Sequence, residues 1–455
     1  MTLDFVRFFR SAPRWRPERR NVESEATELR EILAPITIEQ FAAEYLGKQA
    51  LFVRGQAEKF KRLLDMDSLR RALYIGSQHK PRGFDMRANF ERGLNAKKSA
   101  FIDASYEEIG PLLEAGATLC ITNLHLVDPF LAAVVRRVKV DLGFSGRVGF
   151  NCYLSASGGG FYTHYDARTA MSLQIEGEKT WSYAPRPALA FPQRNASYAL
   201  NGGAVQASKI VDAFVPIEPW ETVIPIPENE FLSETLRPGD LLSLPAGTWH
   251  AAKAGEHSLA LNLYFQHADF LGLVRDVIEP MLRQHESWRS GAPPAPNRPE
   301  RLPGNVLSYF QSRLAELRDA IDRLSAEGPE LEEMWRRLIT LDDLASDESA
   351  LAPAEVPPVD EEQMFRVRRD YPMMVYEKPD GGGEPSAHLL HGSTLLSLSI
   401  EALPILRRLA AVTKFRAREV LEWNAGTSSP AWADVADLLG LLYTHRVIER
   451  VPDVA

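Results

Sequence analysis

Cysteine is nearly absent from this chain, which has 455 residues but only Cys120 and Cys152. Two cysteines cannot build a disulfide framework or a cysteine-rich zinc site. Long hydrophobic runs are also missing, since no apolar stretch approaches the roughly 18 residues that a membrane span needs. The arginine-rich start contains only a short apolar run and is therefore unlike a secretory signal. We expect a cytoplasmic protein that makes no use of a membrane.

An excess of positive charge is missing as well. The chain carries 52 lysines and arginines against 61 acidic residues, a net charge of −9. Nucleic-acid-binding proteins usually present a basic field that releases counterions from phosphates. The basic cluster of this chain lies near the N-terminus and comprises Arg7, Arg10, Arg14, Arg16, Arg19 and Arg20. We interpret residues 1–33 as a solvated, flexible tail, with a tail that binds RNA or a ribosome-like surface as the alternative.

The overall composition is that of a globular protein, with 45% hydrophobic and 25% charged residues. At about 150 residues per domain, the length allows two to four domains. Changes in composition divide the chain after the tail into a central domain (34–283), a helical region (284–345), an acidic proline-rich linker (346–362) and a C-terminal module (363–455).

The central domain is predicted to hold most of the strands. A capping box at Thr37 and Gln40 begins a short helix that ends at Gly47, and a strand follows at residues 51–54. Helical and mixed segments are expected up to Leu142. From Gly146 to about His267, short segments rich in β-branched, aromatic and leucine residues alternate with glycine and proline turns, a pattern typical of a β-sandwich or small barrel.

Other features complete the α+β prediction for the central domain and the helical region. Residues 193–230 are interpreted as an insertion, part loop and part extra strand. The helical region contains an amphipathic helix over 306–324, and a second helix follows. Its apolar positions are Leu307, Phe310, Leu314, Leu317, Ile321 and Leu324. Because an exposed stripe of this width favours symmetric pairing, we predict a homodimer; packing of the stripe on the chain's own barrel or C-terminal module is the alternative.

The C-terminal module has the predicted order strand, strand, three short helices, strand, which is consistent with a winged helix. Basic and acidic side chains balance in this module, and its last helix is nearly free of basic residues. We therefore expect packing or peptide contact instead of DNA binding. His388 and His391 are expected at the surface.

Two histidines and one aspartate form the most informative pattern. His164 and Asp166 are two residues apart in GFYTHYDARTAMSLQIEGEKTW, and such residues project to the same face of a strand. His250 follows a predicted strand and a tight turn in LRPGDLLSLPAGTWH. Two histidines with one carboxylate are the facial triad of non-haem iron(II) oxygenases, which leaves coordination positions open for a cosubstrate and oxygen. A hydrogen-bonded surface histidine on a glycine-rich loop is the alternative interpretation of His164.

These same segments resemble the JmjC branch of the cupin superfamily, and in particular the ribosomal oxygenases, which hydroxylate ribosomal proteins. The resemblance rests on GGGFYTHYD, LQIEGEKTW and LRPGDLLSLPAGTWH, and it extends over most of the chain. It implies a double-stranded β-helix (cupin jelly roll) over 34–283, helical dimerisation over 284–345 and a winged helix over 363–455. It also implies Fe(II), 2-oxoglutarate as cosubstrate and O2.

The resemblance assigns roles to single residues. His164, Asp166 and His250 fall on the catalytic metal ligands of the family. Lys179 falls where the family places the cation that holds the far carboxylate of 2-oxoglutarate, and its alternative is a surface lysine in a turn. The remaining candidate cosubstrate-binding residues are Asn151, Tyr153 and Asn262; Asn151 and Tyr153 could equally be ordinary polar residues of the core.

Two departures from the family's pattern concern the substrate. The insertion at 193–230 lengthens the separation between His164 and His250, so the substrate entrance is not carried over. Asn262 and Tyr264 stand where the ribosomal oxygenases usually carry Thr and Ser, and Asn262 resembles the asparaginyl-hydroxylase branch. We expect an Fe(II)- and 2-oxoglutarate-dependent hydroxylase of a protein or peptide. The alternatives are an N-methyl demethylase and a non-catalytic winged-helix regulator whose cupin senses a metabolite.

Overall fold

A computed structural model gives the fold of the chain. It describes Phe9, Pro13 and residues 29–90, 100–193, 195–201, 204–208, 228–268, 278–294, 303–325, 329–340, 358–369, 371–378, 385–392, 394–423 and 430–451. None of the helices in these ranges is long and apolar enough to cross a membrane.

The N-terminal segment enters the core earlier than the sequence suggests. Helix α2 (Leu29–Leu33) buries Leu29, Ile32 and Leu33, whose spacing places them on one helical face. Phe9 is also buried and meets Tyr106 edge to face at 5.8 Å. The predicted start of order at residue 34 is therefore too late, because aromatic and aliphatic anchors lie inside the arginine-rich tail.

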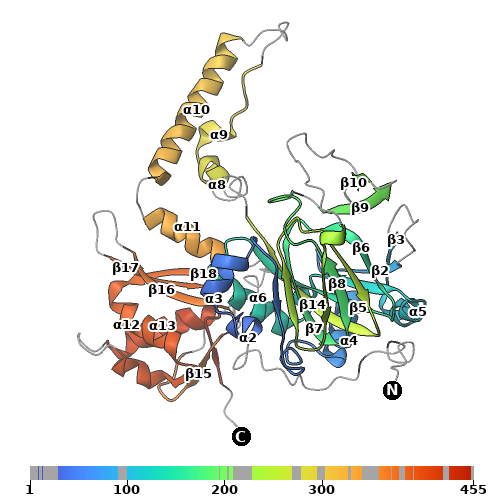
Figure 1. Ribbon diagram of the computed structural model, residues 1–455. Coiled ribbons are helices and arrows are strands. Elements are labelled where there is room, and N and C mark those ends of the chain that lie inside the picture. The colour runs from blue at the N-terminus through green and yellow to red at the C-terminus, as the bar shows by residue number, and fades with distance from the viewer. Residues whose placement is uncertain are drawn as a thin grey trace.

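Two antiparallel sheets make up the central domain (Figure 1). The larger sheet has the order β1 (Leu51–Val53), β12 (Leu241–Leu244), β7 (Thr169–Glu176), β14 (Ser258–Gln266), β5 (Arg147–Ser155), β4 (Thr118–Thr122), β2 (Asp85–Phe90) and β3 (Ala100–Asp103). The smaller sheet has the order β10 (Ala204–Ser208), β9 (Ala196–Asn201), β6 (Gly160–Tyr165), β13 (His250–Ala254), β8 (Lys179–Tyr183) and β11 (Leu232–Leu236). The predicted jelly-roll core is confirmed.

Strands β2, β3 and β4 extend the larger sheet beyond the predicted barrel. The sequence suggested helical and mixed structure here, because β2 reads DMRANF and mixes charged with apolar residues. These three strands form one end of the sheet, beside β5. A sheet edge accommodates charged side chains, so the hydrophobic pattern of a central strand is absent.

Helices are packed with the larger sheet in one core. They are α4 (Met66–His79), α5 (Ile109–Glu114) and α6 (Pro129–Leu142), together with α3 (Ile38–Gln40) and the π-helical turn η1 (Phe41–Tyr45). As predicted, Thr37 caps α3 by accepting a hydrogen bond from the Gln40 amide at 3.1 Å. Short 3₁₀ turns complete the domain at Tyr106–Glu108 (η2), Leu124–Leu126 (η3) and Glu228–Glu230 (η4).

The predicted insertion begins as a hairpin of β9 and β10 that extends the smaller sheet next to β6. Ser197 of β9 pairs with His164 of β6, so the insertion lies directly beside the candidate metal ligand. Residues 209–227 of the insertion lie outside the described residues.

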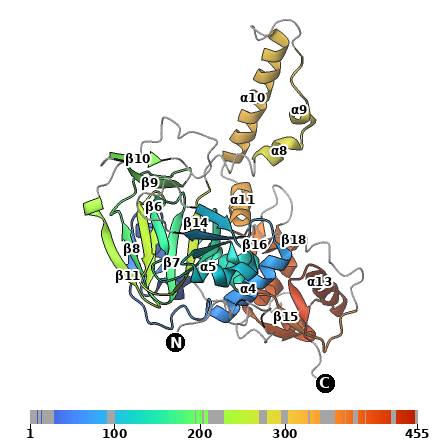
Figure 2. The ribbon, with the colours of Figure 1, turned by 90° about the vertical axis from the view of Figure 1, so that its right-hand side faces the viewer.

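The helical region comprises α8 (Glu279–Arg283), α9 (Glu286–Arg289), α10 (Gly304–Ser325) and α11 (Pro329–Thr340). Helix α10 covers the predicted helix and projects away from the central domain (Figures 1 and 2). Helix α11 contacts α6 of the central domain.

The C-terminal module has its own core and two small sheets. Its elements are β15 (Met364–Val367), β16 (Met373–Lys378), β17 (Ser386–His391), β18 (Thr394–Ser399), η7 (Ile400–Ala402), α12 (Leu403–Ala411), β19 (Lys414–Arg416), η8 (Ala417–Glu422), α13 (Trp432–Thr444) and β20 (Ile448–Arg450). The predicted surface position of His388 and His391 is wrong. Both are buried in β17, where the hydroxyls of Ser386 and Ser397 lie within hydrogen-bond distance of His388 Nε2, and the Arg368 carbonyl lies within that distance of His391 Nε2.

Candidate active site

His164, Asp166 and His250 converge in the middle of the smaller sheet, where strand β6 ends and strand β13 begins. His164 lies in β6 and pairs directly with His250, the first residue of β13. Asp166 follows β6 by one residue, so the turn after the strand carries the carboxylate. One ligand atom from each of the three residues lies within 4.8 Å of the others. The structure thus brings the side chains of His164, Asp166 and His250 together, as the sequence predicts.

Backbone carbonyls fix the orientation of both imidazoles. His164 Nδ1 lies 2.7 Å from the Tyr162 carbonyl oxygen, and His250 Nδ1 lies 2.8 Å from that of Thr248. A carbonyl accepts, so Nδ1 carries the proton and Nε2 keeps its lone pair. This is the arrangement in which neutral histidine binds a metal.

A residue of the insertion, Asn195, holds the Asp166 carboxylate in place. Asn195 donates a hydrogen bond from Nδ2 to Asp166 Oδ1 at 2.8 Å, and its own Oδ1 accepts from the Ala167 amide at 2.8 Å. The Gly247 amide donates to the Asp166 carbonyl at 2.9 Å, which ties the turn before His250 to the turn after His164. Asn195 could not be predicted from the sequence, because it lies outside every motif.

The electrostatics of the three groups favour a cation. Burial alone raises the pKa of Asp166, but His164, His250 and Arg168 outweigh it and hold that pKa below its usual value. Burial, reinforced by His164, lowers the pKa of His250 to about 4. At neutral pH the site therefore offers an uncharged His250 imidazole and an ionised Asp166 carboxylate beside His164, a donor set that fits Fe(II).

Lys179 is buried at the other end of the same pocket. Its side chain is 2% exposed, and Nζ donates to Ser155 Oγ at 2.9 Å. Burial lowers the pKa of Lys179 to about 8. A buried ammonium with no carboxylate within ion-pair distance among the described residues is costly unless a ligand supplies the counter-charge. The alternative of a surface lysine is wrong.

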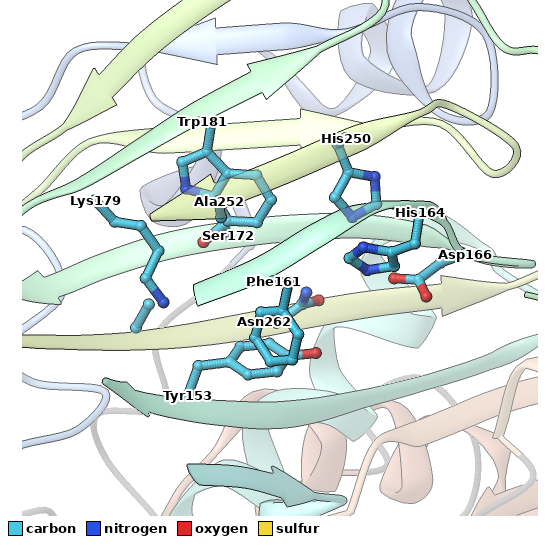
Figure 3. Close-up of a pocket in the computed structure, with 11 residues that line it drawn as sticks. Tyr153, Phe161, His164, Asp166, Ser172, Lys179, Trp181, His250, Ala252 and Asn262 are labelled. Carbon is cyan, nitrogen blue, oxygen red and sulfur yellow. The ribbon is translucent and has the colours of Figure 1, made fainter. Parts of the chain in front are cut away.

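A pocket lies between Lys179 and the triad, with about 430 Å³ of empty space that includes open solvent at its mouth. Figure 3 shows its lining side chains pointing inward from both sheets. They are Tyr153, Phe161, His164, Asp166, Ser172, Lys179, Trp181, His250, Ala252, Ala260 and Asn262. This mixture of apolar and polar groups suits a small polar molecule.

Three buried polar atoms in the pocket have no hydrogen-bond partner among the described residues. They are Ser172 Oγ, Trp181 Nε1 and Asn262 Oδ1. Buried polar groups are normally paired, so unpaired atoms around one cavity indicate a polar ligand. Ser172 and Asn262 are direct neighbours across β7 and β14. Strand alternation could have identified Trp181 from the sequence, since it shares a strand face with Lys179.

The two candidate cosubstrate-binding residues of β5, Asn151 and Tyr153, take different positions relative to the pocket. Tyr153 lines the pocket, and burial raises the pKa of its hydroxyl. Asn151 does not line it. Its Oδ1 accepts a hydrogen bond from the Asn123 amide at 3.0 Å, and its side chain also bonds Tyr153. Asn151 is therefore placed behind the pocket wall.

Comparison with known proteins agrees with this geometry. Residues 134–271 match the model of the JmjC domain, and these residues include all three triad members. The chain is 25% identical over 304 residues to YxbC, an uncharacterized protein of Bacillus subtilis, covering 66% of this chain and 89% of that protein. It is 26% identical over 326 residues to ribosomal oxygenase 2 of Rattus norvegicus, covering 66% of this chain and 62% of that protein.

A solved structure shares the fold. The ribosomal oxygenase YcfD of Escherichia coli, in complex with cobalt and 2-oxoglutarate, superposes with a TM-score of 0.53 at 15% identity, covering 92% of this chain and 99% of that chain. At this identity, the likeness establishes a common architecture. The chain spans less than two thirds of the length of the rat relative, which is consistent with additional sequence in that protein.

Proposed function

The chain carries a JmjC domain similar to that of the ribosomal oxygenases, and we propose that it is an Fe(II)- and 2-oxoglutarate-dependent oxygenase that hydroxylates a protein side chain. One observation carries this proposal. A facial set of two oriented imidazoles and a carboxylate shares a small pocket with a buried, unpaired ammonium.

The roles of the residues follow from their positions. His164 and His250 would bind the metal through Nε2, and Asp166 through its carboxylate. Lys179 would neutralise the far carboxylate of the cosubstrate, which removes the cost of burying both charges. When bound, Fe(II) and 2-oxoglutarate supply the oxidising chemistry that places an oxygen atom from O2 into a C–H bond. Tyr153 and Asn262 line the space between these two ends.

Ribosomal proteins are the first substrate class to examine, because they are the class named by the relatives. An N-methyl demethylase would have the same site, and a metabolite-sensing regulator would bind the same ligands without turnover. Product mass separates the first two: hydroxylation adds one oxygen, whereas demethylation removes a methyl group. Turnover itself separates both from the regulator.

The test is succinate release by the purified full chain with Fe(II), 2-oxoglutarate and O2, followed by mass analysis of intact ribosomal proteins. We expect metal-dependent succinate release that is lost in Asp166→Ala and retained in His79→Ala, an exposed histidine far along the sequence from the site. Undiminished turnover by Asp166→Ala would contradict the metal assignment. Binding of 2-oxoglutarate without any succinate release would favour the regulator.

We also propose that the chain forms a homodimer through the helical region and that the C-terminal module is a neutral winged helix used for packing or peptide contact. Exposed apolar side chains on α10 support the first proposal. The order of elements from β15 to β20 and the balance of charge support the second.

A further inference from the structure

Arg168 is a charged side chain that the proposed chemistry does not use. It lies two residues after Asp166, in the turn between β6 and β7, and is partly exposed. Among the described residues, its guanidinium makes no hydrogen bond and no ion pair. It lies over the ring of Tyr264, at 4.3 Å from Cζ to the centroid. A guanidinium has five donors in a planar fork that matches a carboxylate.

The register of the larger sheet places Arg168 at the metal end of the pocket. On β14, Ala260 and Asn262 line the pocket, and alternation sends Tyr264 to the same inward face. Tyr264 pairs with Ala170 of β7, directly after the turn that holds Arg168. Lys179 lies at the opposite end, beside Ser155 and near Ser258. From one end of the barrel to the other, the spatial order is therefore Lys179, the pocket, the triad and Arg168.

Tyr264 holds the guanidinium in a defined position. The Tyr264 hydroxyl donates to Asn123 Oδ1 at 2.7 Å, and Asn123 Nδ2 donates to the Gly83 carbonyl at 2.8 Å. The Asn123 amide is in turn bound by Asn151 Oδ1. A ring fixed at its hydroxyl offers a rigid face for stacking, so Arg168 is oriented while its N–H groups stay free.

The charges of the loaded site leave Arg168 without a counter-ion. A divalent metal and the Lys179 ammonium would together balance the Asp166 carboxylate and a dianionic cosubstrate. The positive charge of Arg168 then remains uncompensated at the metal end of the pocket. A charge held in this way in a partly desolvated site favours an anionic partner.

We propose that Arg168 binds a carboxylate of the substrate, so that the enzyme selects a peptide with an acidic group next to the target residue. The proposal rests on the proposed function, because it assumes that a peptide is presented to the triad from the Arg168 end. The carboxylate has two possible sources, an Asp or Glu side chain and a free C-terminus. Tyr264 and Asn123 act as positioning residues for the guanidinium.

The test uses the full chain loaded with Mn(II) and 2-oxoglutarate without oxygen, and an array of short fluorescent peptides read by anisotropy. One arm carries Asp or Glu at each position in turn with an amidated C-terminus. Matched arms carry Asn or Gln, carry Lys, or carry a free C-terminal carboxylate only. The protein variants are Arg168→Gln, Arg168→Glu and, as a matched control, Arg407→Gln, which alters an exposed arginine of α12.

We expect wild type and Arg407→Gln to bind peptides with a carboxylate at one fixed position about tenfold more tightly than the amide versions, as a charge-assisted pair would give. Arg168→Gln should lose this preference, and Arg168→Glu should prefer the Lys peptides. The arm that binds identifies the side chain or the C-terminus as the source. Equal binding of acidic and amide peptides by wild type, a preference that survives Arg168→Gln, or no binding at all would overturn the proposal.

Succinate release by wild type, measured in parallel, reports on the proposed function. Release without a carboxylate preference would reject the role of Arg168 and leave the oxygenase intact. A carboxylate preference without release would reject the oxygenase and leave a peptide-binding site.

Discussion

At the scale of single residues, the affinity for metal depends on the groups that orient the ligands. Asn195 is the side chain that fixes the Asp166 carboxylate. Asn195→Ala should weaken metal binding by about tenfold or more, the usual effect of removing an orienting partner. Titration calorimetry with Mn(II) would measure this effect. Asn305→Ala, at an exposed position of α10, should bind metal as wild type does, and equal affinities in the two variants would show that Asn195 has no orienting role.

The buried ammonium makes cosubstrate binding depend on pH. With a pKa of about 8 in the free protein, Lys179 is charged at neutral pH and loses its proton above pH 8. A bound carboxylate favours the charged form, so binding above pH 8 must also take up a proton. The affinity for 2-oxoglutarate should be constant near pH 7 and then fall by up to about tenfold per pH unit above pH 8.

Lys179→Arg provides the control for that measurement, because a guanidinium stays charged over the whole range. Its affinity should be weaker, since the larger group fits the pocket less well, but flat between about pH 7 and about pH 9.5. A wild-type affinity that stays constant to the upper limit would show that Lys179 remains charged without its ligand.

The sequence predicted the residues whose chemistry is strongly constrained and missed those that act through geometry. His164, Asp166, His250 and Lys179 are identifiable because few residue types can bind a metal or a carboxylate. Asn195 and Ser155 make single hydrogen bonds to these groups. Any polar side chain at the right point in space could do so, and no local pattern indicates where an insertion folds back.

At the scale of elements, the turn between β7 and β8 positions Lys179 through a glycine. Gly177 has φ +64°, and a Cβ there would lie 1.7 Å from the His257 carbonyl oxygen. Gly177→Ala therefore combines a left-handed backbone with a backbone clash and should destabilise the domain by about 3 kcal/mol or more. It should also weaken 2-oxoglutarate binding, because Lys179 follows two residues later.

Gly158→Ala is the matched control for this turn. Gly158 also has a positive φ, +75°, but a Cβ would meet no atom within 4 Å. Its cost should be the conformational one alone, about 1 kcal/mol. Thermal melting and cosubstrate titration of both variants would separate steric from conformational effects. An equal loss of stability in the two variants would show that the backbone at His257 moves to accommodate the added Cβ.

The strands were predictable where their environment is uniform. The sequence indicated β5, β7 and β14, because both faces are buried and long apolar runs result. It did not indicate β2, which mixes charged and apolar residues and lies near the end of the larger sheet. The buried histidines of β17 were misjudged for a related reason, since hydroxyl partners such as Ser386 and Ser397 come from pairing that only the fold defines.

At the scale of the whole molecule, α10 raises the question of assembly. The helix stands away from the central domain (Figure 2), and Leu307, Phe310, Leu314 and Ile321 are 41%, 46%, 64% and 44% exposed. Leu317, on the same face, packs with Ile278, Leu282 and Ala320 and belongs to the local core. The stripe predicted from the sequence is thus divided between an internal contact and an uncovered surface.

An uncovered apolar stripe on a projecting helix favours pairing with a second copy. We predict a homodimer of about 100 kDa, twice the 50.9 kDa chain, in sedimentation at micromolar concentration. Phe310→Glu combined with Leu314→Glu should give a folded monomer, because two charges in a closed apolar contact cannot be solvated. Ser308→Glu with Ser312→Glu adds the same charge to the opposite side of α10 and should remain dimeric. A wild-type chain that sediments as a monomer at every concentration, or a control pair that dissociates equally, would reject α10 as the dimer contact.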